Sequence, residues 1–423
     1  MYALGASYKS LENESRSTCL PGTRKSQLGR IKDWVVDPSP DRAPIMWLSG
    51  GAGAGKTSIA QTVAKACAED QDCLAATFFL KGGHTTRSNV EYVIPTLALE
   101  LAYSNNDCRQ VIEENIDRDP LLLTDRSKSW QFSALIRQPL DRAFAKANHT
   151  KPMLIVIDAI DESNSQESLR KWLGAIAESL ERKSSPFRLL LTSRPEHTIV
   201  SFFAEIPHLH EKIELIQDYE SDADIKNYLT HKFDEIRNKH SDLFIGEEHW
   251  PASEDIKWIV DKSSGHFIYA STVINFINTD EDDPMQLLDY IRGGVKSPGT
   301  RSHPFEELDK LYLAVLHRAK GRSKPLNLPL LKFLAVYSNS HDNLIELHSD
   351  YGAMARALNV PRFEVSVLHR NLRSLIGPVG SHFRKERTGF LHKSFSDFLS
   401  SPSRSREFFI VPYHDIYFRH IEW

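Results

Sequence analysis

Residues 50–57 carry a glycine-rich motif that constrains the fold of this chain more than any other feature. They read Gly-Gly-Ala-Gly-Ala-Gly-Lys-Thr, which matches the pattern G-x-x-x-x-G-K-[ST]. An apolar run at 45–48 comes directly before the motif, and a helical pattern at 58–68 follows it. In that order, a strand, a glycine loop and a helix form a loop whose backbone N–H groups can surround a phosphate chain. The sequence therefore predicts a phosphate-binding loop, and the alternative is a chance glycine-rich turn.

The residues of this loop have expected roles in binding a nucleotide. The Lys56 ammonium is expected to reach the β- and γ-phosphates, and the Thr57 hydroxyl is expected to be a ligand of Mg²⁺. The N-terminus of the following helix adds N–H donors and a partial positive charge. The predicted nucleotide-binding residues of the loop are Gly50, Gly51, Ala52, Gly53, Ala54, Gly55, Lys56, Thr57 and Ser58.

Composition indicates an ordinary folded protein with several domains. The chain has 423 residues, of which 41% are hydrophobic and 26% charged, and its formal net charge is −4. Because the chain has no excess of basic residues, its composition does not predict binding to nucleic acid. Apolar runs are shorter than the roughly 20 residues of a membrane span, and the N-terminus lacks a signal-peptide pattern. The four cysteines have no metal-binding spacing, so we expect reduced thiols and a cytoplasmic location.

Five apolar runs alternate with helical patterns in the first half of the chain. Continuous apolar strands separated by helices predict an α/β fold, with a parallel sheet covered by helices on both faces. Ligands of such folds bind at the carboxyl ends of the strands. The runs lie at residues 45–48, 75–80, 153–157, 188–191 and 213–216.

The remainder of the chain changes character. Residues after 216 hold helical patterns only, and a stretch rich in Gly, Pro and Ser follows. After further helical patterns, the sequence predicts a strand pair at 374–379 and 389–392. Helices followed by a hairpin favour a winged helix. The predicted division is a lead-in segment 1–44, a P-loop NTPase domain 45–216, a small helical domain 217–290, a linker 291–310, a winged-helix-like domain 311–400 and a tail 401–423.

A second chemical motif ends the apolar run at 153–157. The sequence continues Asp158-Ala-Ile-Asp161-Glu162. Asp158, at the tip of the strand, is expected to hold Mg²⁺ opposite the phosphates. Either Asp161 or Glu162 can orient or deprotonate the water that attacks the γ-phosphate, and the choice between them stays open. The alternative is that these carboxylates cap the next helix and supply surface charge.

A third motif, Thr-Ser-Arg-Pro at 192–195, ends the run at 188–191. Pro195 favours an extended Arg194, and an arginine past the carboxyl end of a strand points toward the ligand crevice. Its guanidinium matches phosphate oxygens, so Arg194 is a candidate to stabilise the charge of the γ-phosphate. The alternative is an ordinary surface arginine.

Together these motifs resemble the NACHT family of signal-transducing NTPases of the STAND class, in particular its fungal branch. The resemblance also includes Ser-Gly-His-Phe-Ile-Tyr-Ala at 264–270, Leu-His-Lys-Ser-Phe-Ser-Asp-Phe-Leu at 391–399 and Cys-Leu-Pro-Gly-Thr-Arg at 19–24. It covers roughly residues 19–400. The family often has proline in a Gly-x-Pro that packs the adenine, and this chain departs from that pattern with Phe267 at the position of the proline.

The resemblance implies a nucleotide-binding domain, a small helical domain and a winged helix that close around ADP. In animal relatives a histidine contacts the β-phosphate of ADP, and His392 matches that position. Exchange of ADP for ATP with Mg²⁺ would open the module, and slow hydrolysis would restore it. ATP is the expected nucleotide, and GTP has also been proposed within the family. Protein partners or self-association on activation, as in innate-immunity signalling, are implied by the resemblance alone.

Two other functions remain open from the sequence. One is a nucleotide-binding scaffold that never hydrolyses, and the other is a small-molecule or nucleotide kinase. A kinase is expected to carry an arginine-rich lid after the α/β core, whereas residues 217–290 read as a helical bundle. We expect the segments outside the predicted module to be too short for an effector domain or a sensing repeat array, and the sequence leaves open a fragment, a truncated gene product or a minimal switch that works with partners. Trigger and output are therefore not predicted.

Overall fold

The structure, a computed structural model, is divided into two compact units that are described separately. The first comprises residues 1–51 and 55–215, and the second comprises 52–54 and 216–423. Within them the described residues are 2–10, 13, 18–39, 41–70, 72–147, 152–181, 187–215, 219–245, 250–278, 282–294, 305–322, 355, 361–382 and 385–410. Predictions for the middle of the linker, for 323–354 and for most of the tail lie outside these residues.

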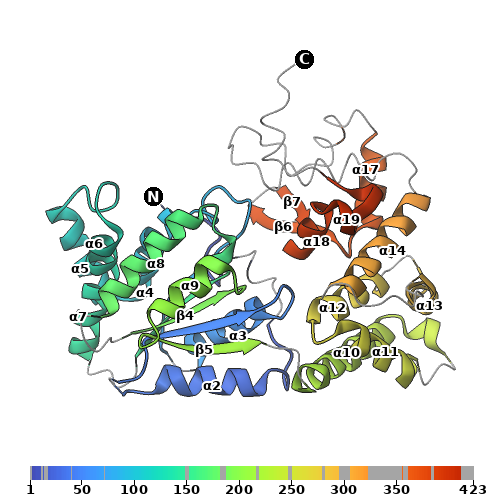
Figure 1. The fold of residues 1–423 in the computed structure, drawn as a ribbon, viewed down its shortest axis with the longest axis horizontal. Coiled ribbons are helices and arrows are strands. Elements are labelled where there is room, and N and C mark those ends of the chain that lie inside the picture. The colour runs from blue at the N-terminus through green and yellow to red at the C-terminus, as the bar shows by residue number, and fades with distance from the viewer. Residues whose placement is uncertain are drawn as a thin grey trace, which may run out of the picture. The chain divides into compact units, whose positions relative to one another are not determined.

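A five-stranded parallel sheet organises the first unit, and it confirms the α/β fold predicted from the apolar runs (Figure 1). The strands lie in the order β2-β3-β4-β1-β5. Their bounds are β1 Ile45–Gly50, β2 Leu74–Phe79, β3 Met153–Asp158, β4 Phe187–Ser193 and β5 His210–Leu215. β1 pairs in parallel with β4 on one side and with β5 on the other, so the carboxyl ends of β1 and β4 are neighbours.

Both faces of the sheet are covered, because the four strands from β2 to β1 are buried almost throughout. Every residue of β1 and β4 is buried, and β2 and β3 are buried except at their first residues. Continuous burial is expected of parallel strands between two helical layers. The edge strand β5 alternates instead, with Ile213 and Leu215 buried and Lys212 and Glu214 exposed. Such charges oppose pairing of the edge with another chain.

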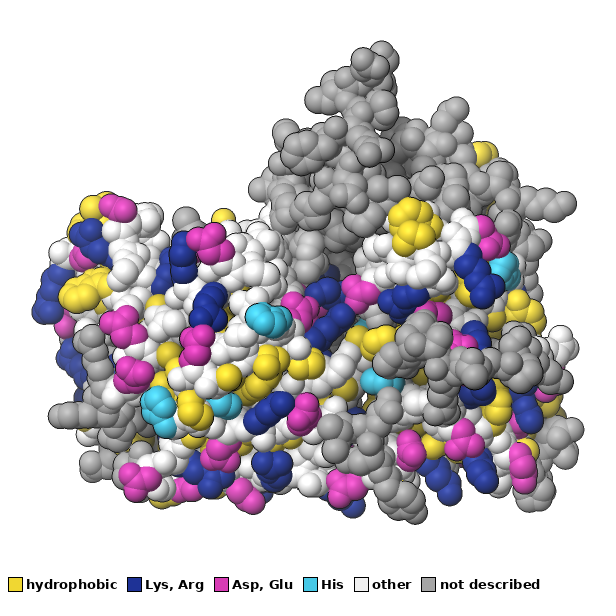
Figure 2. Space-filling view, in the orientation of Figure 1, with side chains coloured by type: hydrophobic (Ala, Val, Ile, Leu, Met, Phe, Trp, Pro, Cys, Tyr) yellow, Lys and Arg dark blue, Asp and Glu magenta, His cyan; other side chains and the backbone are white. Residues whose placement is uncertain are grey.

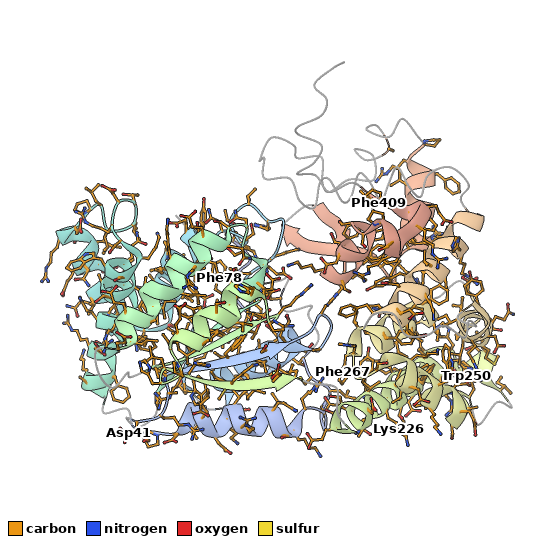
Figure 3. The ribbon with its side chains drawn as sticks, viewed as in Figure 1. Asp41, Phe78, Lys226, Trp250, Phe267 and Phe409 are labelled. Carbon is orange, nitrogen blue, oxygen red and sulfur yellow. The ribbon has the colours of Figure 1, made fainter. Side chains whose placement is uncertain are left out.

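Helices of the first unit surround this sheet, and Figure 3 shows Phe78 of β2 among their side chains. The helical patterns predicted at 58–68 and elsewhere are confirmed, whereas the helices between residues 93 and 147 were not indicated by the sequence. A π-helical turn, Ser133–Arg137, lies between two of them. The helices are α2 Lys25–Val36, α3 Lys56–Glu69, α4 Val93–Ser104, α5 Asn106–Arg118, α6 Lys128–Phe132, α7 Gln138–Ala147, α8 Gln166–Leu180 and α9 His197–Glu205.

The N-terminal segment closes the outer edge of β2. Phe79 donates its backbone N–H to the carbonyl of Ala6 at 2.8 Å, and the N–H of Tyr8 is 3.0 Å from the hydroxyl of Thr77. Inside the unit, the carboxylate of Glu100 accepts the N–H of Thr77 at 2.6 Å. Backbone donors that an edge strand would expose are therefore used within the chain.

The second unit consists mainly of helices, followed by a hairpin and two short helices, α18 Lys393–Leu399 and α19 Pro402–Ser405. The helices α10 Tyr219–Lys239, α11 Ser253–Ser263, α12 Phe267–Ile277, α13 Pro284–Gly294 and α14 Glu306–Arg322 precede α17 Arg362–Asn371. α13 and α14 reach into the predicted linker 291–310 from both sides. α13 continues past residue 290 because its apolar side chains Leu287, Leu288 and Ile291 pack into the core of this unit.

The predicted hairpin is present in the second unit. β6 Ile376–His382 pairs antiparallel with β7 Lys385–Phe390, and α18 Lys393–Leu399 follows. The winged-helix assignment itself stays a prediction. Near the start of the unit, Trp250 stacks on Phe244, with ring centroids 4.6 Å apart, and Figure 3 shows it beside α11.

Charged side chains of both signs are scattered over the face shown in Figure 2, without a large area of one sign. Across the described parts of both units, every helix is too short or too polar to cross a bilayer.

Candidate functional site

The glycine loop joins β1 to α3, as the sequence predicts. Gly50 is the last residue of β1, and Lys56 is the first residue of α3. Gly53 and Gly55 have φ of 72° and 90°, in the left-handed region where a side chain is strained. Glycine at these two positions lets the chain turn sharply into α3, whose first N–H groups lack intrahelical partners. The loop thereby presents backbone donors at the carboxyl end of β1.

Lys56 lies inside this loop as a largely desolvated cation. Its Nζ donates to the carbonyl oxygens of Gly50 at 2.7 Å and Gly51 at 2.8 Å. Burial lowers the pKa of Lys56 to about 8, although the carboxylates of Asp161 and Asp158 oppose the shift. A cation that burial disfavours gains from a nearby anion, because an opposite charge favours the ionised form. The environment of Lys56 therefore suits a phosphate group.

The carboxylate of Asp158 is held by two hydroxyl groups. Thr57 donates to Oδ2 at 2.8 Å, and Thr192, at the end of β4, donates to Oδ1 at 2.6 Å. Thr192 also accepts the N–H of Ala159 at 2.9 Å, and Ala159 has a left-handed φ of 59°. Asp158 and Thr192 are both completely buried. One hydroxyl on each oxygen fixes the carboxylate, with Oδ2 toward Thr57.

Asp161 and Arg194 form a pair. The backbone N–H of Arg194 donates to Oδ1 of Asp161 at 3.1 Å, and its Nε lies 3.5 Å from Oδ2. Asp161 is 5% exposed, so its charge is stabilised inside the protein by this arginine. The predicted arginine thus lies at the site, and its contact in the structure is with a carboxylate of the same motif.

Glu162 takes a different partner. Its Oε2 accepts the backbone N–H of Gly82, in the loop after β2, at 2.6 Å. Glu162 belongs to a short 3₁₀ turn, Ile160–Glu162, directly after β3. Asp161 and Glu162, the two candidates for the general base, therefore have different partners: Asp161 contacts Arg194, and Glu162 contacts Gly82.

His392 lies in the second unit as the N-cap of α18. Its Nδ1 accepts the N–H of Ser394 at 3.0 Å and lies 2.6 Å from the Ser394 hydroxyl. That hydroxyl is also 2.8 Å from the hydroxyl of Tyr312. Because a backbone N–H can only donate, Nδ1 is an acceptor, and a neutral ring carries its proton on Nε2. A contact between His392 and a nucleotide stays a prediction.

Two residues of the site were not assigned from the sequence. Thr192 could have been found from the sequence, because it is a polar residue that follows the apolar run at 188–191 and begins the Thr-Ser-Arg-Pro motif. Gly82 had none, because it acts through its backbone N–H. The first unit brings Thr57 and Asp158 into contact beside Lys56, and Thr192 orients Asp158.

The oxygen ligands at this site suit Mg²⁺, which binds few protein groups, better than a metal ion whose ligands all come from the protein. The described residues contain no group of three or more His, Cys, Asp or Glu side chains arranged for a metal. Thr57 and Asp158 offer one hydroxyl and one carboxylate, both oxygen ligands. Mg²⁺ commonly binds one or two such groups together with waters and phosphates of a substrate. The residues present are therefore compatible with a magnesium–nucleotide complex.

One family model matches part of this chain. Residues 24–194 match the family model described as "Nephrocystin 3, N-terminal", a range that includes the glycine loop, Asp158 and Arg194. A comparison with curated proteins returns no match. Among solved structures, a Walker-type ATPase of Pyrococcus abyssi is similar at 10% identity and a TM-score of 0.40, over 90% of this chain and 98% of that one.

Two further solved structures are similar to this chain. The Orc1 protein of Aeropyrum pernix, solved in complex with DNA, has 14% identity and a TM-score of 0.35, over 89% of this chain and 91% of that one. Cdc6p of Pyrobaculum aerophilum has 12% identity and a TM-score of 0.38, over 89% and 92%. The family match, the parallel sheet and the strand–glycine loop–helix arrangement identify the first unit as a P-loop NTPase fold.

Proposed function

We propose that this chain is a nucleotide-dependent signalling switch of the NACHT and STAND class, which binds ATP with Mg²⁺ and hydrolyses it slowly to ADP. The observation that carries the proposal is the hydrogen bond between Thr57 and Asp158 beside the half-buried Lys56. A hydroxyl, a carboxylate and a desolvated ammonium on a glycine loop are the groups that a metal-bound triphosphate needs.

Each group has a role in this proposal. Backbone N–H groups of residues 50–58 bind the phosphates, and Lys56 binds the β- and γ-phosphates. Thr57 and Asp158 hold Mg²⁺, which, when bound, neutralises the negative charge that develops on the phosphates. Arg194 orients Asp161 in the resting site and is available to the γ-phosphate when that pair opens.

Glu162 is the better candidate for the general base. Asp161 is buried and forms two contacts with Arg194, so proton transfer to it would break a stabilised ion pair. Glu162 is only half-buried, and its carboxylate accepts a backbone N–H rather than pairing with a cation in the described structure. A base must also be able to reach water, and this favours the more accessible carboxylate.

The switch itself rests on His392 in this proposal. A ligand shifts a two-state equilibrium only through its different affinities for the two forms. A change from 1:99 to 99:1 needs about 5.5 kcal/mol, whereas one charge-assisted bond between histidine and phosphate gives about 1.5–3 kcal/mol. Contacts between domains or a protein partner, including a second copy, must supply the remainder. A competition assay between ATP and GTP would show which of the two nucleotides the site prefers.

Single-turnover hydrolysis tests the enzymatic half of the proposal. A slow release of phosphate that requires Mg²⁺ and disappears in Glu162→Gln supports an NTPase. The contact between Glu162 and Gly82 favours a second candidate, a scaffold that binds nucleotide without hydrolysis, since it occupies the proposed base. No phosphate release above background from a wild-type protein that binds ATP would leave only the scaffold, whereas equal release from the wild type and from Glu162→Gln would exclude Glu162 as the base.

The rate of ADP release tests the switching half. His392 is also a helix cap, so His392→Ala removes both a ring and a capping group. His392→Asn is the matched control, because asparagine is a good N-cap but lacks the imidazole. Faster ADP release in both variants supports the histidine–phosphate contact. Release at the wild-type rate in His392→Asn would remove that contact from the mechanism.

A further inference from the structure

Glu162 is directed to the opposite side of β3 from the other two carboxylates of the site. Its Oε2 accepts the N–H of Gly82, which follows β2. Asp158 instead bonds to Thr192 of β4. In the sheet β3 lies between β2 and β4, and β1, which leads into the glycine loop, lies beyond β4. The carboxylate proposed as the base is therefore held on the side away from β1.

The effects of the three carboxylates on the pKa of Lys56 agree with this orientation of Glu162. Three carboxylates act to raise the pKa of Lys56, and the effect of Asp161 is the largest of the three while that of Glu162 is the smallest. Because the attraction between charges falls with distance and with exposure to water, Glu162 is the carboxylate least coupled to the lysine. Both observations separate the Glu162 carboxylate from Lys56, the residue expected to bind the γ-phosphate.

The loop that carries Gly82 is well ordered by its own contacts. The N–H of Ser88 donates to the carbonyl of His84 at 3.1 Å, and the N–H of Arg87 donates to Nδ1 of His84 at 3.2 Å. Arg87 is completely buried, and its Nε donates to the carbonyl of Phe79, the last residue of β2, at 3.0 Å. These contacts hold the loop, and with it the N–H of Gly82, against the end of β2.

The same loop makes a second contact with the turn after β3. Asn164 donates its N–H to the carbonyl of Ser88 at 2.8 Å. The pair Gly82–Glu162 and the pair Ser88–Asn164 dock the loop against the turn at two points. Phe79 also donates its N–H to Ala6 of the N-terminal segment. Any movement of the β2 end thus alters the donor that holds Glu162.

We propose that Gly82 is a positioning residue of the hydrolytic reaction, whose backbone N–H holds Glu162 in a resting orientation that must open before water is activated. This inference rests on the proposed function. Once released, the Glu162 carboxylate accepts a proton from water as the water oxygen bonds to the γ-phosphorus. The bond between that phosphorus and the β–γ bridging oxygen breaks, its electrons stay on ADP, and inorganic phosphate forms. The bond to Gly82 makes the resting rate slow.

Single-turnover hydrolysis of ATP with Mg²⁺ in two Gly82 variants tests the inference. Gly82→Pro lacks the N–H, whereas Gly82→Ala keeps it, and a Cβ there would lie 3.4 Å from Oε2 of Glu162, an ordinary contact. The loss of one charge-assisted hydrogen bond corresponds to about 10- to 100-fold in rate. We expect that acceleration in Gly82→Pro, a rate within about 3-fold of wild type in Gly82→Ala, and unchanged ATP affinity in both. An unchanged or slower rate in a Gly82→Pro protein that binds ATP normally overturns the inference.

Amide hydrogen exchange at Gly82 supplies a measurement that needs no proline. We expect slow exchange with ADP bound, at least about 10-fold faster exchange with a non-hydrolysable ATP analogue, and fast exchange in Glu162→Ala with either nucleotide. Equal exchange in all four samples would show that Glu162 does not hold this N–H.

The failures of the inference and of the proposed function are distinguishable. In the double variant Gly82→Pro with Glu162→Gln, the acceleration must vanish if Glu162 is the base. A wild-type protein that neither binds nor hydrolyses ATP contradicts the proposed function whatever the Gly82 variants do. A wild type that hydrolyses ATP through Glu162, with no response in Gly82→Pro, contradicts only the role of Gly82.

Discussion

The hydroxyl of Thr57 donates a hydrogen bond of 2.8 Å to Oδ2 of Asp158, although 101 positions separate the two residues. Thr57 is the second residue of α3, and Asp158 is the last residue of β3. Parallel strands align their carboxyl ends at one edge of the sheet, so a residue at the start of a helix after β1 can meet the tip of β3. This contact places two oxygen ligands where a magnesium ion would join the phosphates.

Thr192 is expected to control the affinity of the site for Mg²⁺. Thr192→Val keeps the shape of the side chain but removes the hydroxyl that orients Asp158, and a hydrogen bond to a charged group contributes about 1.5–3 kcal/mol. We expect the Mg²⁺ concentration for half-maximal hydrolysis to rise by about 10-fold or more. Thr192→Ser restores the hydroxyl and is the control. Equal magnesium dependence in Thr192→Val and the wild type would contradict the orienting role.

The affinity for ATP is expected to fall above pH 8. Burial holds the pKa of Lys56 at about 8 in the free protein, and a bound phosphate raises it, so binding above pH 8 requires uptake of a proton. The phosphates stay fully ionised in this range. The dissociation constant should rise by about tenfold per pH unit until the lysine of the complex also titrates. Lys56→Arg, charged throughout, should give a flat profile, and parallel profiles for the two proteins would contradict the assignment.

Asp161 and Glu162 are expected to respond differently to removal of their charges. Glu162→Gln should lower the hydrolysis rate by about 10²- to 10⁴-fold, the contribution of a general base, with little change in melting temperature. Asp161→Asn should lower the free energy of unfolding by about 1.5–3 kcal/mol, since it weakens the buried contact with Arg194. Thermal melting and single-turnover assays on both variants check this. A reversed pattern would exchange the roles of the two residues.

Glu100 is expected to reduce stability at neutral pH. Burial raises the pKa of its carboxyl above the ordinary value of 4.5 for glutamate, against hydrogen bonds from Ser7 and Thr77 that lower it. The folded state then binds more protons than the unfolded state between 4.5 and the raised pKa, so stability is lost as pH rises through that window. Glu100→Gln keeps an acceptor for the Thr77 N–H without the charge, and we expect a higher melting temperature at pH 7. The gain should shrink at pH 4, and a gain independent of pH would point to another cause.

The sheet and the glycine loop could be predicted because their sequence signals are local. A continuous apolar run such as residues 153–157 reflects burial on both faces, and Gly53 and Gly55 reflect backbone angles that only glycine adopts easily. The helices from 93 to 147 were missed, since α6 has only 5 residues and the apolar faces of the others are completed only by tertiary contacts.

Site contacts that depend on packing could not be predicted. The sequence indicated that Asp161 and Glu162 lie near the phosphates, but their partners come from other strands: Arg194 follows β4, and Gly82 follows β2. Strand order decides which of them faces which acid, and a sequence pattern does not specify that order. The helical ends of the predicted linker were also missed, because glycine, proline and serine concentrate between α13 and α14 and obscured the apolar residues on either side.

The most direct test of the account is the nucleotide that the purified protein retains. Chromatography of the denatured wild-type protein should reveal ADP or ATP in near-stoichiometric amount, and binding of added ATP should require Lys56. We predict that Lys56→Ala, folded by its melting curve, retains no nucleotide and does not bind added ATP with Mg²⁺. Retention by Lys56→Ala equal to that of the wild type would contradict the claim that this loop binds the triphosphate.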